Sequence, residues 1–234
     1  MIGFTGFGEP FLIPNIVEAV KEITHKHYVI FNTNLTSSKI KEFAETIDPK
    51  KVVSICASLH IKELERRNLM DRFIDNFLYC RRKGFNIFVR VVAYPPLSCE
   101  IKKYTLFFKR FDIKLKFDPF IGVYDGKRYP DSYSSKELSA FGFKHTEIDE
   151  FHTKGRVCNA GYNTGIVGSD ENIYTCSQIH ENIGNIYKKI SFKKKLLKCP
   201  IDSCDCPWFK YSVFLFEKAL REKKGCKNNK YVCC

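Results

Sequence analysis

The chain has 234 residues, of which 44% are hydrophobic, enough for a substantial core in one domain with a smaller appendage. The formal net charge of +13 permits binding of nucleic acid or acidic substrates, but the basic residues are spread along the chain, which disfavours a nucleic-acid partner. No apolar run is long enough to span a membrane and no signal peptide is visible, so we expect a cytoplasmic protein without a membrane partner.

Apolar strands and amphipathic helices alternate over the first half of the chain. Strands are predicted at 1–5, 28–34, 52–60, 85–94 and 112–120, and helices at 14–24, 37–47, from the third strand to about residue 84, and near 99–110. A serine is expected to cap the helix at 37–47. Near-continuous apolar strands separated by helices predict a parallel sheet, either open or part of a β/α barrel.

Polar and glycine residues cluster where the predicted strands end. In parallel α/β folds, ligands bind at the carboxyl ends of the strands. The residues at these ends are Gly6, Gly8, Glu9, Asn32, Thr33, Asn34, Ser58, His60, Arg90 and Asp118. Each also has a structural explanation, because loops need Gly, Asn and Ser to turn and to cap helices. As a set, they predict a ligand-binding edge.

Eight of the eleven cysteines lie from residue 158 onward. The other three, Cys56, Cys80 and Cys99, have apolar or helical neighbours and are interpreted as small core residues. The region 158–206 contains five in polar or Gly/Pro-rich settings: Cys158, Cys176, Cys199, Cys204 and Cys206.

A hairpin is predicted between the first two cysteines of this region, with its turn at 168–172, and the last three lie in one knuckle. Four converging thiolates are what an iron–sulfur cluster or a structural zinc ion requires. Disulfides in a secreted domain and unliganded core cysteines are the alternatives. A reducing cytosol disfavours the disulfides.

The remaining segments connect and close these two parts. Residues 121–157 are predicted to link them, through an exposed turn-rich loop (124–133) and a short capped helix (134–143). His180 is close enough to the hairpin to be a candidate for contact with a metal ligand. Residues 211–223 are expected to form a terminal helix, followed by a tail with three further cysteines.

Several motifs resemble the radical S-adenosylmethionine (radical SAM) enzymes after their first strand. These are TGFGEP, NTN, ASLH and VRVV at the ends of, or within, successive strands. The CNAG hairpin, the GNI motif and the cysteine knuckle resemble the auxiliary-cluster extension called SPASM, or its shorter twitch form. The resemblance implies a partial (β/α) barrel at 1–120, a connecting segment at 121–157, an iron–sulfur domain at 158–210 and a C-terminal helix and tail at 211–234.

The resemblance also implies roles for individual residues. It assigns Gly6, Phe7, Gly8 and Glu9 to the methionine end of SAM, where glycine permits close approach of the backbone. It assigns Asn32, Asn34, Ser58 and Arg90 to the ribose and carboxylate of SAM. It implies that the ligands of an auxiliary 4Fe–4S cluster come from Cys158, Cys176, Cys199, Cys204 and Cys206. A single cluster needs four of these five.

The sequence departs from the family in two places. It contains no CxxxCxxC loop, whose thiolates hold the cluster that cleaves SAM, and Glu171 occupies a turn position where glycine is often found. We therefore expect a radical SAM chain that lacks its first β/α unit and, as written, has no catalytic residues.

Three functions remain open from the sequence. The first is a radical SAM enzyme that abstracts hydrogen from a peptide, carbohydrate or small-molecule substrate. The second is a non-catalytic iron–sulfur or SAM-binding protein that partners an electron donor or a full-length enzyme. The third is a basic nucleic-acid-binding protein with a zinc knuckle, in which zinc replaces the cluster.

Overall fold

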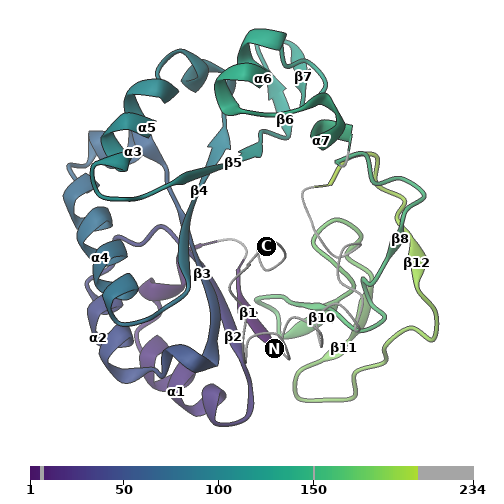
Figure 1. Cartoon of the computed structure of the whole chain (residues 1–234). Helices are drawn as coiled ribbons and strands as arrows, with labels where there is room; N and C mark the ends of the chain where they lie inside the picture. Colours follow the sequence, from purple (N-terminus) through teal and green to yellow (C-terminus); the bar gives the residue numbers. More distant parts are fainter. Residues whose placement is uncertain (6–7, 150, 205–234) are drawn as a thin grey trace. The chain divides into compact units, whose positions relative to one another are not determined.

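The computed structural model describes residues 1–5, 8–149 and 151–204, which belong to two compact units (Figure 1). Unit 1 comprises residues 1–143, and unit 2 begins at residue 144, inside the predicted connecting segment. The predicted terminal helix at 211–223 and the tail lie outside the described residues. Within the described residues, no helix is both long and apolar enough to cross a membrane.

Unit 1 is built on a five-stranded parallel sheet in the order β1-β2-β3-β4-β5. The strands are β1 (Ile2–Phe4), β2 (Val29–Thr33), β3 (Val52–Ser58), β4 (Ile87–Ala93) and β5 (Leu115–Pro119). The predicted parallel α/β sheet is thus confirmed. Among the described residues, β1 and β5 are the two edges of this sheet and do not pair with each other.

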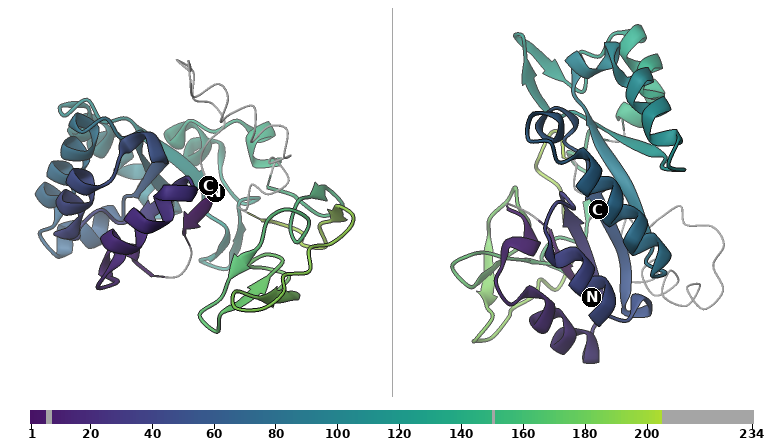
Figure 2. Two further views of the ribbon diagram at one scale, coloured as in Figure 1. Left: turned by 90° about the horizontal axis from the view of Figure 1, so that it is seen from below. Right: turned by 90° about the vertical axis from the view of Figure 1, so that its left-hand side faces the viewer.

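Helices cover one face of this sheet (Figures 1 and 2). They are α1 (Ile16–Lys26), α2 (Lys39–Thr46), α3 (Ile61–Arg66), α4 (Met70–Arg82) and α5 (Ile101–Lys109), with short 3-10 turns η1 (Pro10–Leu12), η2 (Pro49–Lys51) and η3 (Pro95–Cys99). The core between sheet and helices is rich in aromatic side chains. Phe31 of β2 packs against Phe11 and Phe43, with ring centroids 5.2 and 5.1 Å apart.

One helix prediction is corrected, and the predicted serine cap is confirmed at Ser37. The long helix after the third strand is two helices, because Asn68 adopts a left-handed conformation (φ 53°) that interrupts α3 and α4. At the start of α2, the N-cap Ser38 makes no capping hydrogen bond with its side chain. Ser37 does so instead, since its Oγ accepts from the Lys39 N–H at 3.3 Å.

Unit 1 ends in a hairpin and a capped helix. The segment predicted as an exposed loop begins at the end of β6 (Gly122–Tyr124) and contains β7 (Lys127–Tyr129). The two strands are joined through Asp125 and Gly126, which both have positive φ. The capped helix is confirmed as α6 (Ser135–Phe141), with a capping box between Ser134 and Glu137.

Unit 2 contains little regular structure. Its elements are α7 (His145–Asp149), β8 (Val157–Cys158), β9 (Ile166–Val167), β10 (Asn172–Tyr174), β11 (Asn182–Asn185) and β12 (Leu197–Lys198). The predicted hairpin is confirmed, because β9 and β10 are antiparallel, and β11 adds a third strand. Glu171, at the turn position flagged from the sequence, has a φ of 65°, a left-handed conformation that glycine would adopt without strain.

Candidate functional site

A row of polar side chains crosses the open face of the sheet near the carboxyl ends of four strands. The row consists of Asn32 on β2, Ser58 on β3, Arg90 on β4 and Asp118 on β5. Ser58 donates a hydrogen bond from Oγ to Asn32 Oδ1 at 3.1 Å, and Arg90 forms an ion pair with Asp118. All four side chains are partly exposed, so they remain accessible to a ligand.

The alternation of side chains along each strand explains why the row faces away from the helices. Phe31 points into the helical layer, where its ring meets Phe43 of α2. Because successive residues of a strand point to opposite faces, the next residue, Asn32, points to the open face. In the same way, Ser58 and Arg90 are register partners on neighbouring parallel strands and therefore share a face.

The open face also carries a second cation. Lys116 of β5 is the register partner of Arg90, and its Nζ lies 4.7 Å from the centroid of the Phe88 ring. A cation over an aromatic ring is attracted to the negative face of its π-system. Arg90 and Lys116 thus lie side by side with Asp118, and this part of the face favours an anionic group on a ligand.

Asp118 is among the strand-end residues singled out from the sequence but is not among those assigned to SAM. Lys116 and Phe88 were not predicted to belong to the site. A signal for all three was present. Counting in steps of two along each strand places Phe88 on the face of Arg90, and places Lys116 and Asp118 together on the next strand. The register between β4 and β5 then decides which of these side chains are neighbours.

The Glu9 side chain joins the start of η1 to the end of β2. Its carboxylate accepts hydrogen bonds from Thr33 Oγ1 at 2.6 Å, from the Asn34 N–H at 2.6 Å and from the Phe11 N–H at 3.2 Å. Gly8, directly before it, has a φ of 107°. Residues that carry a Cβ atom rarely adopt this φ, so the backbone conformation at position 8 favours glycine. Gly6 and Phe7 lie outside the described residues.

Asn34 plays a local structural role. Its Oδ1 accepts from the Thr36 N–H at 3.0 Å and from Thr36 Oγ1 at 2.7 Å, which closes a turn after β2. Of the two asparagines assigned to SAM, Asn32 is therefore the one whose side chain lies in the polar row.

Unit 2 brings four cysteines from distant parts of the chain into its interior. They are Cys158, Cys176, Cys199 and Cys204, each between 7 and 9% exposed. Pairing of β8 with β12 places Leu197 opposite Cys158, so that Cys199 follows nearby, and Cys176 lies just after β10. Cys158, Cys176 and Cys199 share one buried cluster with Ala160. The fifth predicted ligand, Cys206, lies outside the described residues.

Backbone N–H groups point at two of these sulfur atoms. The Ala160 N–H donates to Cys158 Sγ at 3.5 Å, and the Ile179 N–H donates to Cys176 Sγ at 3.3 Å. Burial raises the pKa of the Cys158 thiol; the Ala160 N–H lowers this pKa, and the neighbouring Cys199, Cys176 and Cys204 raise it. The Ala160 N–H would stabilise a Cys158 thiolate, and the neighbouring thiols oppose its ionisation unless a cation is shared.

Two polar atoms beside these cysteines have no hydrogen-bond partner among the described residues. They are Asn159 Nδ2, next to Cys158, and Thr175 Oγ1, next to Cys176. A buried donor without a partner costs free energy, so such atoms indicate a missing group. The inorganic sulfides of an iron–sulfur cluster accept hydrogen bonds of this kind.

Four thiolates are the donor set of both a structural zinc ion and a 4Fe–4S cluster. Within the part of the chain that the structure describes, no three His, Cys, Asp or Glu side chains are placed to hold a metal ion. The four buried cysteines supply the soft ligands that either group needs. The ring of His180 packs against that of Tyr174 in a tilted arrangement, with ring centroids 5.6 Å apart.

The cysteines of unit 1 are not part of this site. Cys56 and Cys80 are buried, as predicted, and burial raises the pKa of Cys80 to about 12. Cys99 is exposed, so its interpretation as a core residue is wrong. It lies at the end of η3, where the chain turns into α5 at the surface.

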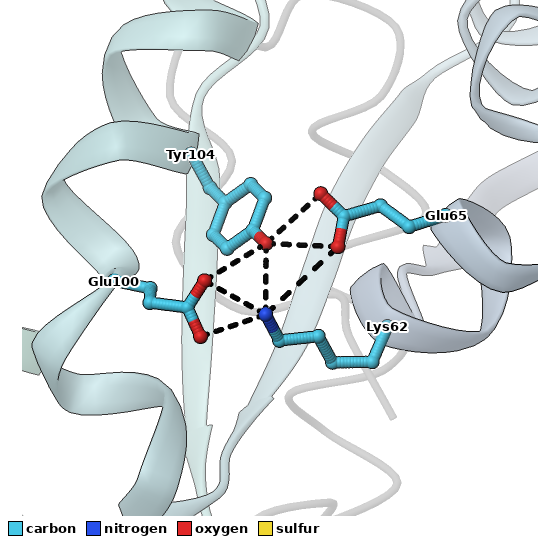
Figure 3. A network of polar contacts seen from close by, with 4 residues as sticks. All are labelled: Lys62, Glu65, Glu100 and Tyr104. Atoms are coloured by element: carbon cyan, nitrogen blue, oxygen red, sulfur yellow. Dashed lines mark hydrogen bonds and ion pairs between the residues drawn. The ribbon is translucent and has the colours of Figure 1, made fainter.

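A groove of about 760 Å³ lies among α3, α4 and α5, away from the polar row. Beside it, Lys62 and Glu65 of α3 meet Glu100 and Tyr104 at the start of α5 (Figure 3). Lys62 Nζ lies 2.7 Å from Glu100, and Tyr104 donates to Glu65 at 2.9 Å. The hydrogen bond to Glu100 raises the pKa of Lys62, and the bond to Lys62 lowers the pKa of Glu100. This network holds two helices together.

No family model and no curated protein sequence matches the chain. Solved structures of anSMEcpe are similar in fold. The structure with bound AdoMet and the Kp18Cys peptide has a TM-score of 0.57 and 18% identity, over 81% of this chain and 64% of that one. The structure with AdoMet alone has a TM-score of 0.58 and 19% identity, over 80% and 64%.

The chain thus spans less than two thirds of the length of these structures. At this identity the likeness concerns the fold alone, and it confirms an α/β fold similar to that of anSMEcpe.

Proposed function

We propose that this chain is a radical SAM protein that binds SAM on the open face of unit 1 and a 4Fe–4S cluster in unit 2. The polar row at the carboxyl ends of β2 to β5 carries the proposal, because parallel α/β folds bind ligands at this edge. A structure of similar fold holds AdoMet, which supports SAM as the ligand.

Each residue of the row has a proposed role in SAM binding. Asn32 and Ser58, already hydrogen-bonded to each other, offer a donor and an acceptor to the ribose hydroxyls. Arg90 offers its guanidinium to the carboxylate of the methionine moiety, with Asp118 fixing its orientation. The backbone of residues 6–9 would bind the amino group, as the family resemblance implies.

Cys158, Cys176, Cys199 and Cys204 are the proposed ligands of the auxiliary cluster, with Cys206 as an alternative fourth thiolate. We place this cluster within the proposed domain at 158–210, after a barrel portion at 1–120 and the segment 121–157. A cluster in this position supplies electrons or anchors a substrate. The Ala160 and Ile179 N–H groups would stabilise its thiolates. A thiolate site of this kind needs a reducing compartment, so we place the protein in the cytoplasm.

Cleavage of SAM to a 5′-deoxyadenosyl radical requires a further cluster on a CxxxCxxC loop, which the 234-residue sequence does not contain. We propose this reaction only for an assembly that includes such a loop. A peptide is the proposed substrate, since a structure of similar fold holds a peptide. A second proposed function is a non-catalytic iron–sulfur and SAM-binding partner of a full-length enzyme, in which the polar row and the buried cysteines bind both groups without SAM cleavage.

Anaerobic reconstitution tests the cluster. We expect about four iron and four sulfide per chain. Cys158→Ser and Cys176→Ser should each lower the iron content, whereas Cys99→Ser, which changes an exposed thiol of unit 1, should leave it unchanged. Bound zinc without iron would favour the zinc-knuckle function and contradict the proposal.

Calorimetric titration with SAM tests the open face. Arg90→Gln should weaken SAM binding roughly tenfold to a hundredfold, because it removes a charge-assisted hydrogen bond. Arg72→Gln is the matched control, since Arg72 is an exposed cation on α4, and it should leave the affinity unchanged. Absence of SAM binding to the reconstituted chain, or equal losses in both variants, would contradict the proposed site.

A further inference from the structure

Residues 186–198 of unit 2 combine exposed apolar side chains with a high density of lysine. We call this stretch the lysine-rich segment; it runs between β11 and β12 in Figure 1. It contains six lysines and no acidic residue. Its large exposed apolar side chains are Ile186 (44% exposed), Tyr187 (76%), Ile190 (40%), Phe192 (47%) and Leu196 (46%).

The backbone of the segment is held in place, so its side chains are displayed from an ordered support. The Tyr187 N–H donates to Asn185 Oδ1 at 3.0 Å, which starts a tight turn after β11. The Ser191 N–H then bonds to the Ile183 carbonyl at 2.7 Å, and the Lys193 N–H bonds to the Gly161 carbonyl at 2.7 Å. The apolar side chains are therefore exposed on an anchored loop.

The charge of the segment is largely uncompensated. Lys193 pairs with Glu181. The other lysines, at positions 188, 189, 194, 195 and 198, are exposed and have no ion-pair partner among the residues that the structure describes. Five cations so close together attract a surface of high negative charge density. The partner must also accept apolar side chains, since these lie between the lysines.

Nucleic acids and anionic membranes both offer dense negative charge. Single-stranded nucleic acids bind through stacking of bases on aromatic rings, together with cations that contact phosphates. Ile186, Ile190 and Leu196 cannot stack on bases. At a bilayer surface, aliphatic and aromatic side chains enter the boundary between headgroups and acyl chains, while lysines remain at the anionic headgroups. The mixture of side chains therefore favours the membrane.

We propose that the lysine-rich segment attaches the protein peripherally to an anionic lipid bilayer. Tyr187 at the turn enters the interfacial layer together with the other exposed apolar side chains of the segment, Ile186, Ile190, Phe192 and Leu196. The unpaired lysines contact the headgroups. This attachment differs from a membrane-spanning helix. The segment contains none of the residues proposed to bind SAM or the cluster, so vesicle sedimentation of the reconstituted chain tests it separately from the proposed function.

Sedimentation with phosphatidylcholine vesicles, with and without phosphatidylserine, tests the attachment on the full reconstituted chain. We expect binding that requires phosphatidylserine and weakens with salt. Changing Lys188, Lys189, Lys194 and Lys195 together to Ala should weaken binding about fivefold for each lysine, roughly several hundredfold in all. The matched control changes four exposed lysines of unit 1 to Ala, namely Lys21, Lys26, Lys102 and Lys109, and should bind nearly as the wild type does.

Insertion is tested separately by Tyr187→Trp. Its additional fluorescence should shift to the blue on anionic vesicles and be quenched by brominated lipids. Equal losses of vesicle binding in the lysine variant and the control would show a net-charge effect only and would overturn the proposal. Fluorescence of the Tyr187→Trp variant that does not shift on anionic vesicles would overturn it as well. Absence of vesicle binding, with poly-uridylate bound through the same lysines, would assign the segment to nucleic acid instead.

Discussion

Unit 1 and unit 2 fill their interiors with different side chains. In unit 1, Phe11, Phe31, Phe43, Phe73 and Phe108 are each at most 1% exposed. In unit 2, the buried cluster consists of three cysteines and an alanine, with three aliphatic residues packed at its margin. Thiols and a methyl group remove much less apolar area from water than phenyl rings do, so the hydrophobic effect stabilises this cluster weakly.

The comparison indicates that the two units depend on different sources of stability. Unit 1 has helices and strands that bury a contiguous core, as self-sufficient domains do. Unit 2 has strands of two to four residues and two buried polar atoms without partners among the described residues. Small units of this kind usually need a metal or a disulfide. Unit 2 is therefore expected to need a bound group, and unit 1 is not.

Removal of iron should have the largest effect and should be confined to unit 2. Chelation of the reconstituted chain is expected to abolish hydrogen-exchange protection of β8 to β12, because binding of the cluster supplies the free energy that orders the thiolates. Protection of β2 to β4 should persist. Hydrogen exchange followed by mass spectrometry on proteolytic fragments measures both. Unchanged protection of unit 2 would mean that its own side chains suffice.

Phe43→Ala should destabilise unit 1 by about 3–5 kcal/mol, since it deletes a fully buried ring that contacts Phe11, Phe31 and Phe85. Leu106→Ala is the control, because Leu106 is 56% exposed, and should cost less than about 0.5 kcal/mol. Urea titration followed by circular dichroism at the helical minimum gives both free energies of unfolding. Similar values for the two variants would contradict the assignment of the core.

Asn76→Ala should cost about 1–3 kcal/mol in the same titration. The Asn76 Nδ2 group donates to the Leu35 carbonyl at 2.9 Å and to the Ser37 carbonyl at 3.2 Å, and the substitution leaves these acceptors without a donor. Asn15→Ala serves as the comparison, because the exposed Asn15 makes no capping hydrogen bond with its side chain. A cost below that of the control would show that water replaces the lost donor.

Tyr104→Phe should have the smallest effect, about 1 kcal/mol. It removes only the hydroxyl that joins Lys62, Glu65 and Glu100 in the network between α3 and α5. Tyr28→Phe, which keeps the ring that Lys51 contacts, should change the free energy of unfolding by less. If the two variants are indistinguishable, the network of Figure 3 contributes nothing measurable to the stability of unit 1.

Much of unit 1 could be predicted from the sequence, because its strands and helices carry strong hydrophobic periodicity. The strand at 52–60 and the helix at 14–24 are found within two residues of their observed ends at β3 and α1. The break at Asn68 was missed, since a left-handed residue inside a helical pattern leaves little trace in hydrophobicity. The Asp125-Gly126 pair is typical of a two-residue hairpin turn and was a usable signal for the pairing of β6 with β7.

The candidate sites also contain features that could be predicted from the sequence and features that could not. The residues at the strand ends were predictable, because topology alone brings them to one edge. The partnership of Arg90 with Asp118 was not, since it depends on the register of β4 and β5. In unit 2, the hairpin could be predicted from its turn, whereas the pairing of β8 with β12 joins two-residue strands far apart in the sequence. No local pattern encodes such a contact.

The Glu9 carboxylate has a kinetic consequence. By bonding to Thr33 and to the Asn34 N–H, it holds Glu9 and the start of η1 at the end of β2 before any ligand arrives. A ligand that binds at this edge meets a surface that needs no rearrangement there. Its association should follow a single exponential whose rate rises linearly with ligand concentration, without the plateau that a slow conformational step imposes.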